Sequence, residues 1–181
     1  MKQRQKVVPR ANGRVLEIGV GSGLNFSFYD PERVTGVVGL DPSVEMFELV
    51  GDKTDALPFP VEFVEGVAEE IPLGDHSVDT VLVTYTLCTI LDVVAALRDM
   101  RRVLKDDGTL IFCEHGLAPD ENVRKWQHRL NPVWNKLGGG CNLNRNIPAL
   151  LQDGGFRIRD MDQMYLPGFK PASFNYWGTA A

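Results

Sequence analysis

The sequence predicts an α/β fold, a doubly wound parallel sheet in one domain that spans residues 1–181. Three observations support this prediction. The largely apolar residues 15–18 lead into Gly19, Gly21 and Gly23, and such a turn is typical of the junction between a buried strand and a helix. Short apolar runs then alternate with amphipathic stretches, which is the order of a parallel sheet. The chain of 181 residues, 44% of them hydrophobic, is also long enough to bury one core.

Five short, largely apolar runs rich in β-branched side chains predict strands. They span residues 15–18, 34–40, 61–66, 77–84 and 109–113. Helices are expected to begin at Asn25, at Ser43 and at Asp92, and the last has apolar residues at intervals of three and four before a stop at Asp107-Gly108. Residues 2–10 are basic and polar and predict the end of an N-terminal helix whose earlier turns are short or missing.

Charge and cysteine content narrow the class of protein. The formal net charge of −5 argues against a nucleic-acid substrate, because contacts to phosphates need clustered Lys and Arg. Cys88, Cys113 and Cys141 have no Cys-x-x-Cys spacing, which predicts free thiols in a reducing compartment and no zinc or other metal. No apolar run reaches membrane-spanning length, so no membrane anchor is expected. These features predict a cytoplasmic protein that acts on a small molecule.

The glycine spacing indicates which nucleoside the first turn binds. A dinucleotide turn reads Gly-x-Gly-x-x-Gly, whereas here Gly23 follows Gly21 by two positions and Glu17 precedes Gly19 by two. A carboxylate repels a pyrophosphate but attracts the ammonium and sulfonium of S-adenosylmethionine. The first amides of the helix expected at Asn25 would face the same ligand. The pattern resembles motif I of the class I S-adenosylmethionine-dependent methyltransferases. A purely structural turn and a nicotinamide-dependent reductase are the alternatives.

A second acid ends the second expected strand. Asp41 lies 22 residues after Gly19, where a carboxylate can accept hydrogen bonds from both hydroxyls of a ribose. The sequence Asp41-Pro42-Ser43 is also a good start for a helix, so a loop-capping role is the alternative. Both roles can hold together.

The segment after the third expected strand resembles the adenine-binding segment of this superfamily, Gly-Asp-Ala-Glu-x-Leu-Pro. Here Val67 stands where the acid of that segment would be. The resemblance therefore implies that the adenine contacts the backbone of Val67 and Ala68, or the carboxylate of Glu69. Thr84 and Tyr85 end the fourth strand and should open onto the same crevice, because the carboxyl ends of parallel strands meet at one edge of a sheet.

Residues 119–145 differ in composition from the rest of the chain. They contain two tryptophans and three consecutive glycines, with apolar residues at helical spacing and Pro132 predicting a kink or a break. An insertion at the carboxyl edge of the sheet is a natural cover for a substrate, although Trp126 and Trp134 also fit plain packing. A helix over residues 147–152 is expected to follow.

Several short segments of the sequence resemble one particular branch of this superfamily. They are Leu16-Glu-Ile-Gly, Asn25-Phe-Ser-Phe-Tyr, Leu40-Asp-Pro-Ser, Leu87-Cys88, Arg102-Val-Leu-Lys, Glu114-His115, Trp126-Gln127, Pro132-Val-Trp and Gly140-Cys-Asn-Leu-Asn-Arg. Together they resemble the methyltransferase-like branch (methyltransferase type 11 domain) that includes the animal thiol S-methyltransferases. The resemblance implies a Rossmann-like, seven-stranded, mostly parallel sheet with a final antiparallel hairpin over residues 157–165 and 174–179, and S-adenosylmethionine as methyl donor.

Direct methyl transfer asks the protein mainly to position the reactants and exclude water. A base is needed only when the acceptor arrives protonated, as a thiol does. His115, after the fifth strand, is the expected proton acceptor, with a loop-holding hydrogen bond as the alternative role, and His128 is a second candidate. Tyr85 could orient the acceptor. Cys88 and Cys113 are expected to be small core residues, because direct transfer forms no enzyme-bound intermediate.

The residues expected to contact the cofactor lie at strand ends and in the turns that follow them. They are Glu17, Gly19, Val20, Gly21, Gly23, Asn25, Asp41, Pro42, Val67, Ala68, Glu69, Thr84 and Tyr85. The unusual Val67 and the short N-terminal helix leave a second interpretation open, in which the chain binds S-adenosylmethionine without catalysing transfer.

Overall fold

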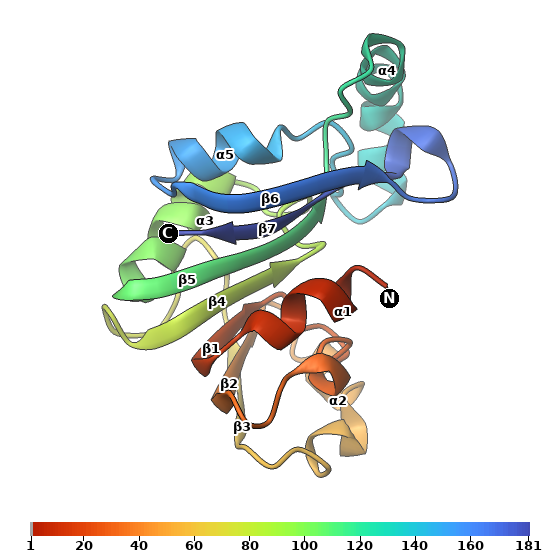
Figure 1. Ribbon diagram of the computed structural model, residues 1–181. Coiled ribbons are helices and arrows are strands. Elements are labelled where there is room, and N and C mark those ends of the chain that lie inside the picture. Colours follow the sequence, from red (N-terminus) through yellow and green to blue (C-terminus); the bar gives the residue numbers. More distant parts are fainter. Residues whose placement is uncertain (1) are drawn as a thin grey trace.

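The computed structural model describes residues 2–181 and contains a seven-stranded sheet in the order β3-β2-β1-β4-β5-β7-β6 (Figure 1). The strands are β1 (Gly13–Ile18), β2 (Val34–Asp41), β3 (Val61–Glu65), β4 (Val78–Thr84), β5 (Leu104–His115), β6 (Ile158–Tyr165) and β7 (Phe174–Ala180). All pairings among β1 to β5 are parallel, while β7 runs antiparallel to both β5 and β6. The predicted mostly parallel sheet and its final hairpin are confirmed.

Five α-helices and four short 3-10 turns precede or connect these strands within residues 2–181. They are α1 (Arg4–Val7), η1 (Val8–Arg10), η2 (Phe26–Phe28), α2 (Glu45–Glu48), η3 (Gly51–Thr54), α3 (Val93–Val103), α4 (Glu121–Leu137), α5 (Ile147–Asp153) and η4 (Lys170–Ala172). The helix expected at Asp92 is confirmed, and the Asp92 carboxylate caps it by accepting a hydrogen bond from the Ala95 amide at 2.9 Å. The helical end expected within residues 2–10 corresponds to α1 and η1.

Alternate residues of the central strands supply two separate apolar layers, as the pleat of a strand requires. In β1, Leu16 belongs to one layer and Val15 to the other. The first layer packs against α3 and α5, whose buried residues include Leu97 and Leu151. The second layer packs against α1 and η1 on the opposite face, where Val7 is completely buried (Figure 1). The sheet is therefore covered on both faces, which explains why its strands are nearly continuous apolar runs.

Two expected helix boundaries are wrong. The helix expected at Asn25 is only the single turn η2, because Tyr29 already has extended backbone and Pro31 disfavours a helical conformation at the residue before it. The stop expected at Asp107-Gly108 is also misplaced. There α3 ends at Val103, and Leu104 adopts extended backbone and pairs with Val78 of β4.

The helix does not break at Pro132, where a kink or a break was expected, since α4 continues through this residue. Pro132 lies on the exposed side of α4, and so does His128 four residues earlier. The carbonyl that loses its helical hydrogen bond to the proline can therefore bond to water instead.

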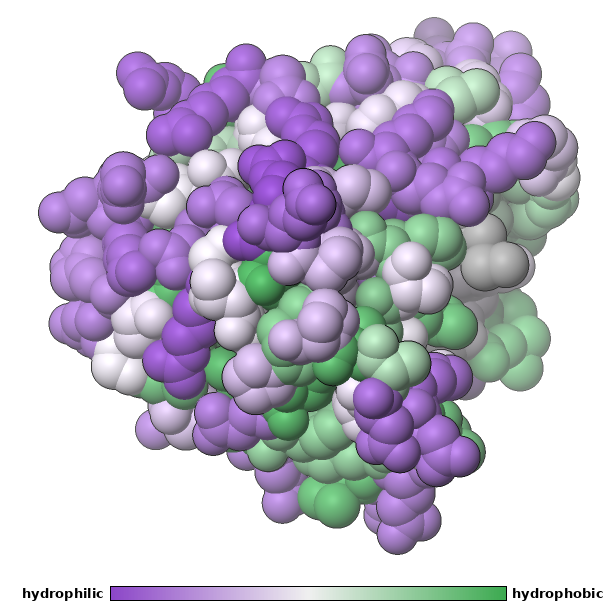
Figure 2. Space-filling model, turned by 60° about the horizontal axis from the view of Figure 1, so that its bottom comes forward, coloured by the Kyte–Doolittle hydropathy of each residue, from purple (hydrophilic) through white to green (hydrophobic). Residues whose placement is uncertain are grey.

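Figure 2 views the molecule from the end that carries α2 and β3, and shows apolar side chains gathered between polar ones. Leu24, Val44 and Leu49, which flank η2 and α2, are among the exposed large apolar residues. None of the helices within residues 2–181 combines the length and apolar character that a bilayer span requires.

Candidate active site

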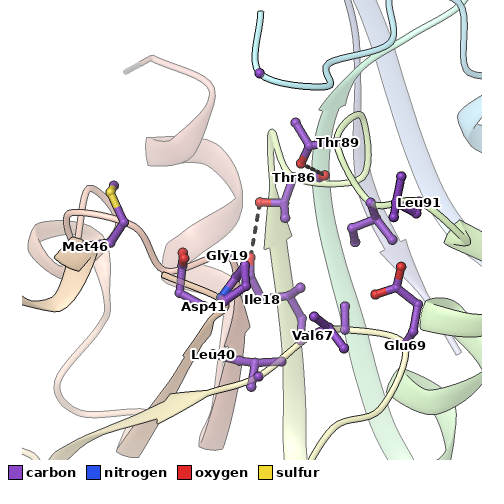
Figure 3. A pocket seen from close by; sticks show the side chains of 15 residues that line it. Ile18, Gly19, Leu40, Asp41, Met46, Val67, Glu69, Thr86, Thr89 and Leu91 are labelled. Atoms are coloured by element: carbon purple, nitrogen blue, oxygen red, sulfur yellow. Dashed lines mark hydrogen bonds between the residues drawn. The ribbon is translucent and has the colours of Figure 1, made fainter. Parts of the chain in front are cut away.

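The carboxyl ends of β1 and β2 border a cavity of about 810 Å³, a volume within the usual range for small-molecule sites. Its walls also include the segment after β3, the turn after β4 and one glycine of the loop after α4 (Figure 3). Six of the residues predicted to bind the cofactor line it, namely Gly19, Asp41, Pro42, Val67, Ala68 and Glu69. The cavity lies where the strand ends of a doubly wound sheet place a ligand.

Gly19 brings the end of β1 close to the turn that follows β4. Its φ is +68°, and a Cβ atom at this position would lie 2.6 Å from side-chain atoms of Thr86. Thr86 is held there because its hydroxyl donates a hydrogen bond to the Ile18 carbonyl at 3.2 Å (Figure 3). The Gly19 amide donates to the carbonyl of Leu40 at 2.8 Å, which joins the ends of β1 and β2. Only glycine fits this position without strain.

Asp41 stands at the end of β2 and faces the cavity (Figure 3). One carboxylate oxygen accepts a hydrogen bond from the Gly21 amide at 3.0 Å, and the other accepts from the Ser43 amide at 3.1 Å. This geometry is therefore compatible with both roles expected of Asp41, which are to cap the loop and to bind the ribose of the ligand. Each carboxylate oxygen retains a lone pair for a further donor.

The segment after β3 forms the far wall of the cavity. Val67 is 47% exposed and Ala68 is buried, and both line the cavity. The carboxylate of Glu69 also lines it and accepts a hydrogen bond from the Asp92 amide at 3.2 Å. Val67 thus presents an apolar side chain to the cavity at the position where the superfamily segment has an acid.

Glu17 is buried behind the glycine turn and does not line the cavity, although the sequence predicted that its carboxylate would attract the charged groups of the cofactor. Its carboxylate accepts hydrogen bonds from the Asn25 amide group at 2.8 Å and from the Tyr29 hydroxyl at 2.6 Å. Burial raises the pKa of Glu17 to about 7, although these two hydrogen bonds and the charge of Arg4 act in the opposite direction. Its charge therefore depends on pH in the neutral range.

Arg4 of α1 was not predicted from the sequence, yet it joins the polar group beside Glu17. Its guanidinium donates to Asn25 Oδ1 at 2.8 Å and to Thr84 Oγ1 at 2.5 Å, and it lies over the ring of Tyr85. Asn25 also donates to Thr84 Oγ1 at 3.0 Å. The predicted residues Glu17, Asn25 and Thr84 are thus brought together by one hydrogen-bonded network, to which α1 adds a cation.

Other predicted residues lie around this network, and neither Thr84 nor Tyr85 lines the cavity onto which both were expected to open. Tyr85 has a φ of +56°, its hydroxyl donates to Asn175 of β7 at 2.8 Å, and burial raises its pKa above the ordinary value. Val20 is buried below the turn, whereas Gly21 and Gly23 both have positive φ. Gly23 lines a separate cavity beside η2.

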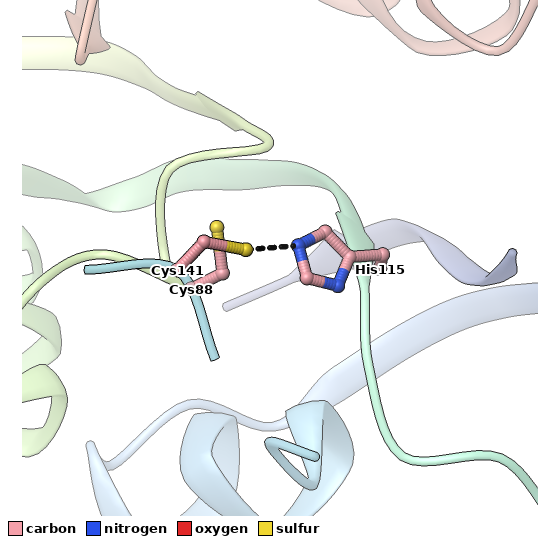
Figure 4. Close-up of side chains that lie close together, drawn as sticks. All are labelled: Cys88, His115 and Cys141. Carbon is pink, nitrogen blue, oxygen red and sulfur yellow. Dashed lines mark hydrogen bonds between the residues drawn. The ribbon is translucent and has the colours of Figure 1, made fainter. Parts of the chain in front are cut away.

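His115, at the end of β5, lies in a cluster with two cysteines (Figure 4). Its Nε2 atom is 3.2 Å from the sulfur of Cys141, and Cys88 is the third member. Hydrogen bonds from Cys88 and from His115 lower the pKa of Cys141 well below its ordinary value. Burial acts to lower the pKa of His115, but the hydrogen bond with Cys141 and the charges of Cys141 and Glu114 together outweigh it, so this pKa is raised. Cys88 is buried, as the sequence predicted.

His128 lies elsewhere. It is exposed on α4, and its Nδ1 atom is 2.9 Å from the side-chain amide of Asn144. The third cysteine, Cys113, is completely buried in the layer that α1 covers.

The insertion over residues 119–145 is fixed to the sheet by a buried side chain. Gln127 of α4 is completely buried and accepts a hydrogen bond from the Ala118 amide at 2.9 Å. Its amide nitrogen lies 2.9 to 3.0 Å from the carbonyl oxygens of Gly116, Leu143 and Pro171. The loop after α4 then contributes Gly139 to the cavity wall.

The sequence matches a methyltransferase domain family over residues 16–112, which is more than half of the chain. The chain belongs to this methyltransferase family. The match begins in β1, just before the glycine turn, and ends in β5, so it includes the strand ends that form the cavity. Membership confirms the resemblance to class I S-adenosylmethionine-dependent methyltransferases and identifies S-adenosylmethionine as the cofactor. It also disfavours the nicotinamide-dependent alternative.

Comparison with individual methyltransferases supports the same family. Thiol S-methyltransferase TMT1B of Rattus norvegicus is 35% identical over 134 residues, which cover 72% of this chain and 54% of the rat protein. Thiol S-methyltransferase TMT1A of Homo sapiens is 32% identical over 162 residues, with coverages of 88% and 66%. The crystal structure of the YcgJ protein of Bacillus subtilis shares the fold, with a TM-score of 0.71 at 20% identity over 99% of this chain and 93% of that one. The chain thus spans between one half and two thirds of these two curated relatives.

The methyltransferase glycine turn can be tested by replacing Gly19 with alanine. Positive φ alone costs a non-glycine residue about 1 to 2 kcal/mol. At Gly19 the new methyl group would also collide with Thr86, so we expect affinity for S-adenosylhomocysteine to fall by about tenfold or more. Gly51→Ala is the matched control, because Gly51 also has positive φ but has no atom within 4 Å of an added Cβ. Calorimetric titration and thermal unfolding of both variants separate strain from collision. Equal affinities in the two variants would contradict this role of Gly19.

Proposed function

We propose that this methyltransferase-family chain transfers a methyl group from S-adenosylmethionine to a small acceptor, and that the acceptor is a thiol. The observation that carries the proposal is the cavity at the ends of β1 and β2, where the glycine turn and the Asp41 carboxylate meet. The match over residues 16–112 supports the methyl donor. The thiol is supported by the names of the two curated relatives, which are both thiol S-methyltransferases.

The residues at the cavity fit the cofactor. The backbone at Gly21 is open to a ligand, because the atom nearest to an added Cβ would be the terminal methyl group of Met46 at 3.5 Å. Asp41 offers a carboxylate to ribose hydroxyls. Val67 and Ala68 offer an apolar surface to the adenine. When bound, S-adenosylmethionine supplies an electrophilic methyl group on a sulfonium centre.

We assign the network of Arg4, Glu17, Asn25 and Thr84 to the amino-acid end of the cofactor. Arg4 provides a guanidinium, which pairs well with a carboxylate. Thr84 and Asn25 provide neutral polar groups between this cation and the buried acid. The network therefore presents charges of both signs, as the carboxylate and ammonium groups of an amino acid require.

The acceptor is proposed to approach from the side of β5, beneath the insertion over residues 119–145. Gly139 of this insertion lines the cavity, and Cys141 lies beside His115. We propose His115 as the acceptor of the thiol proton. It is partly exposed at the end of β5, and the neighbouring strand β4 leads into the turn that lines the cavity. His128 is less well placed for this role, since it is exposed and contacts Asn144.

His115→Ala is expected to lower the rate of methyl transfer to a thiol by about 100-fold, the size of a typical acid-base contribution, while affinity for S-adenosylhomocysteine changes little. Single-turnover rates and calorimetric titration measure the two quantities. His76→Asn is the control, because His76 is an exposed histidine with positive φ, which asparagine tolerates, and its contact is to Asp106. An unchanged single-turnover rate in His115→Ala would remove His115 from the reaction.

The decisive experiment is a screen of small thiols, amines, alcohols and carboxylates with radiolabelled methyl donor. Labelled thioether from the thiols, and from no other class, is the expected result. Binding of S-adenosylhomocysteine without transfer to any acceptor would favour the alternative of a binding module. Transfer only to another class would keep the methyltransferase and overturn the thiol.

We also propose a cytoplasmic location and an acceptor that is not a nucleic acid. Three cysteines without disulfides suit a reducing compartment. The net charge of −5 gives little attraction for a phosphate backbone. Fractionation of cells that express the natural protein tests the location.

A further inference from the structure

Three separate segments bring metal-binding side chains to one point beside the cavity. Cys88 follows β4, His115 ends β5, and Cys141 lies in the loop after α4 (Figure 4). One ligand atom from each residue lies within 4.8 Å of the other two. The segments are distant in sequence, so the fold alone makes this group.

The spacing of the ligand atoms is close to that of a tetrahedral zinc site. Zn–S bonds of about 2.3 Å and Zn–N bonds of about 2.0 Å separate neighbouring ligand atoms by roughly 3.5 to 3.8 Å. The sulfur of Cys141 and Nε2 of His115 are 3.2 Å apart, and no pair in the cluster exceeds 4.8 Å. Side-chain rotations alone can therefore place the three atoms around one ion. Two thiolates and an imidazole are a donor set that zinc prefers.

Backbone contacts hold the cluster together independently of any ion. The Asn142 amide donates to the Cys88 carbonyl at 2.9 Å, and its side chain donates to the same oxygen at 3.0 Å. Arg145 donates to the carbonyls of Leu87 and Ile90 at 2.6 and 2.5 Å. The loop that carries Cys141 is thus attached on both sides of Cys88. A preformed geometry reduces the entropy that metal binding must overcome.

The surroundings leave one side of the cluster accessible. Cys88 is buried, but His115 and Cys141 are each partly exposed. Three protein ligands with an open fourth position are the pattern of a catalytic zinc site, whereas structural sites have four protein ligands. Glu114, the residue before His115, is completely buried, and its carboxyl group and the guanidinium of Arg145 both act on Cys88 with opposite charges. These charges are compatible with a divalent cation.

We propose that Cys88, His115 and Cys141 bind a Zn²⁺ ion whose fourth position takes the sulfur of the acceptor thiol. The metal site stands on the geometry of the three side chains, and the identity of the fourth ligand rests on the proposed function. On binding, the S–H bond of the acceptor breaks, a sulfur–zinc bond forms and the proton leaves to solvent. The imidazole of His115 is then a ligand of the ion. The ion, in place of His115, promotes the loss of the proton from the acceptor thiol.

Metal content tests the site without reference to activity. The full chain is reduced, loaded with one equivalent of Zn²⁺ and dialysed against a chelator of micromolar affinity. We expect about one zinc ion per chain to remain, as for a site with three protein ligands. Cys141→Ala, Cys88→Ala and His115→Ala should each bind the ion at least about 100-fold more weakly. Circular dichroism shows whether each variant is folded.

The chain contains matched controls for both residue types. Cys113→Ala removes the cysteine that is outside the cluster, and His76→Asn removes an exposed histidine, and both should keep one zinc ion. With Co²⁺ in place of Zn²⁺, the wild-type chain should show a thiolate-to-cobalt charge-transfer band that is absent from Cys141→Ala. A wild-type chain that retains no zinc and shows no such band would overturn the site.

Activity then separates this proposal from the methyltransferase proposal. If zinc is retained and removing it stops methyl transfer to thiols, both proposals hold. Retained zinc without transfer to any acceptor would leave the metal site standing and overturn the proposed function. Transfer to thiols at full rate by a zinc-free chain would keep the methyltransferase and overturn the role of the ion.

Discussion

Asp41→Ala is expected to lower affinity for S-adenosylhomocysteine by at least about 100-fold, because it would remove the two charge-assisted hydrogen bonds that we propose Asp41 makes to the ribose, worth about 1.5 to 3 kcal/mol each. The substitution also removes the acceptor of the Gly21 and Ser43 amides, so the glycine turn and the start of α2 lose a common partner. We expect the sheet to remain folded, since Asp41 lies at a strand end and outside both apolar layers. Calorimetric titration gives the affinity, and thermal unfolding monitors the fold.

Two further variants make this experiment specific. Glu65→Ala is the control, because Glu65 pairs with Asp41 in the sheet register and is exposed at the end of β3, but does not line the cavity. Its affinity should match that of the wild-type chain. Asp41→Asn keeps one acceptor oxygen and should lie between the two. If Asp41→Ala binds S-adenosylhomocysteine with wild-type affinity, Asp41 does not contact the ribose.

Glu17→Gln is expected to remove part of the pH dependence of stability. The pKa of Glu17 is about 7 in the folded protein and 4.5 is its ordinary value, so the folded state binds a proton more tightly than the unfolded state. The stabilisation from this proton is complete below about pH 4.5 and is lost as the pH rises through about 7. The difference between these pKa values corresponds to about 3 kcal/mol. Glutamine can keep both hydrogen-bond partners and does not titrate.

Urea unfolding between pH 5 and pH 8 measures this effect. The free energy of unfolding of the wild-type chain should fall with increasing pH more steeply than that of Glu17→Gln. Tyr29→Phe should shift the fall to higher pH, because the Tyr29 hydroxyl donates to the carboxylate and thereby favours its charged form. Parallel pH profiles for wild type and Glu17→Gln would show that Glu17 keeps an ordinary pKa in the folded protein.

Most of the fold could be predicted because the strand signal is local. The sequence runs that form β1 and β4 are largely apolar and are buried on both faces, and such runs fit a covered parallel sheet. The helix at Asp92 has both a cap and a clear period. The turn η2 could not be told from a helix by period alone, since five residues before Pro31 fit either structure. The end of α3 was missed because pairing with β4 competes with local helix propensity.

The cofactor side of the site was more predictable than the acceptor side. Gly19 and Asp41 are found by sequence spacing, because one strand and one turn place each of them. Arg4 could not be found in this way, since it reaches Thr84 across 80 residues of sequence. The absence of a Cys-x-x-Cys motif led to the expectation of no metal, but Cys88 and Cys141 meet through tertiary structure, and no local pattern records that contact.

The burial of Gln127 has a consequence for how molecules reach the reaction centre. One side chain joins α4 to the segments that carry Gly116, Leu143 and Pro171. Moving α4 outward would break all of these bonds at once and leave the carbonyl groups of the buried residues Gly116 and Leu143 without this donor, which costs about 1 to 3 kcal/mol for each group. We therefore expect α4 and the loop after it to keep this position during turnover. The width of the opening that they leave then selects which molecules are modified.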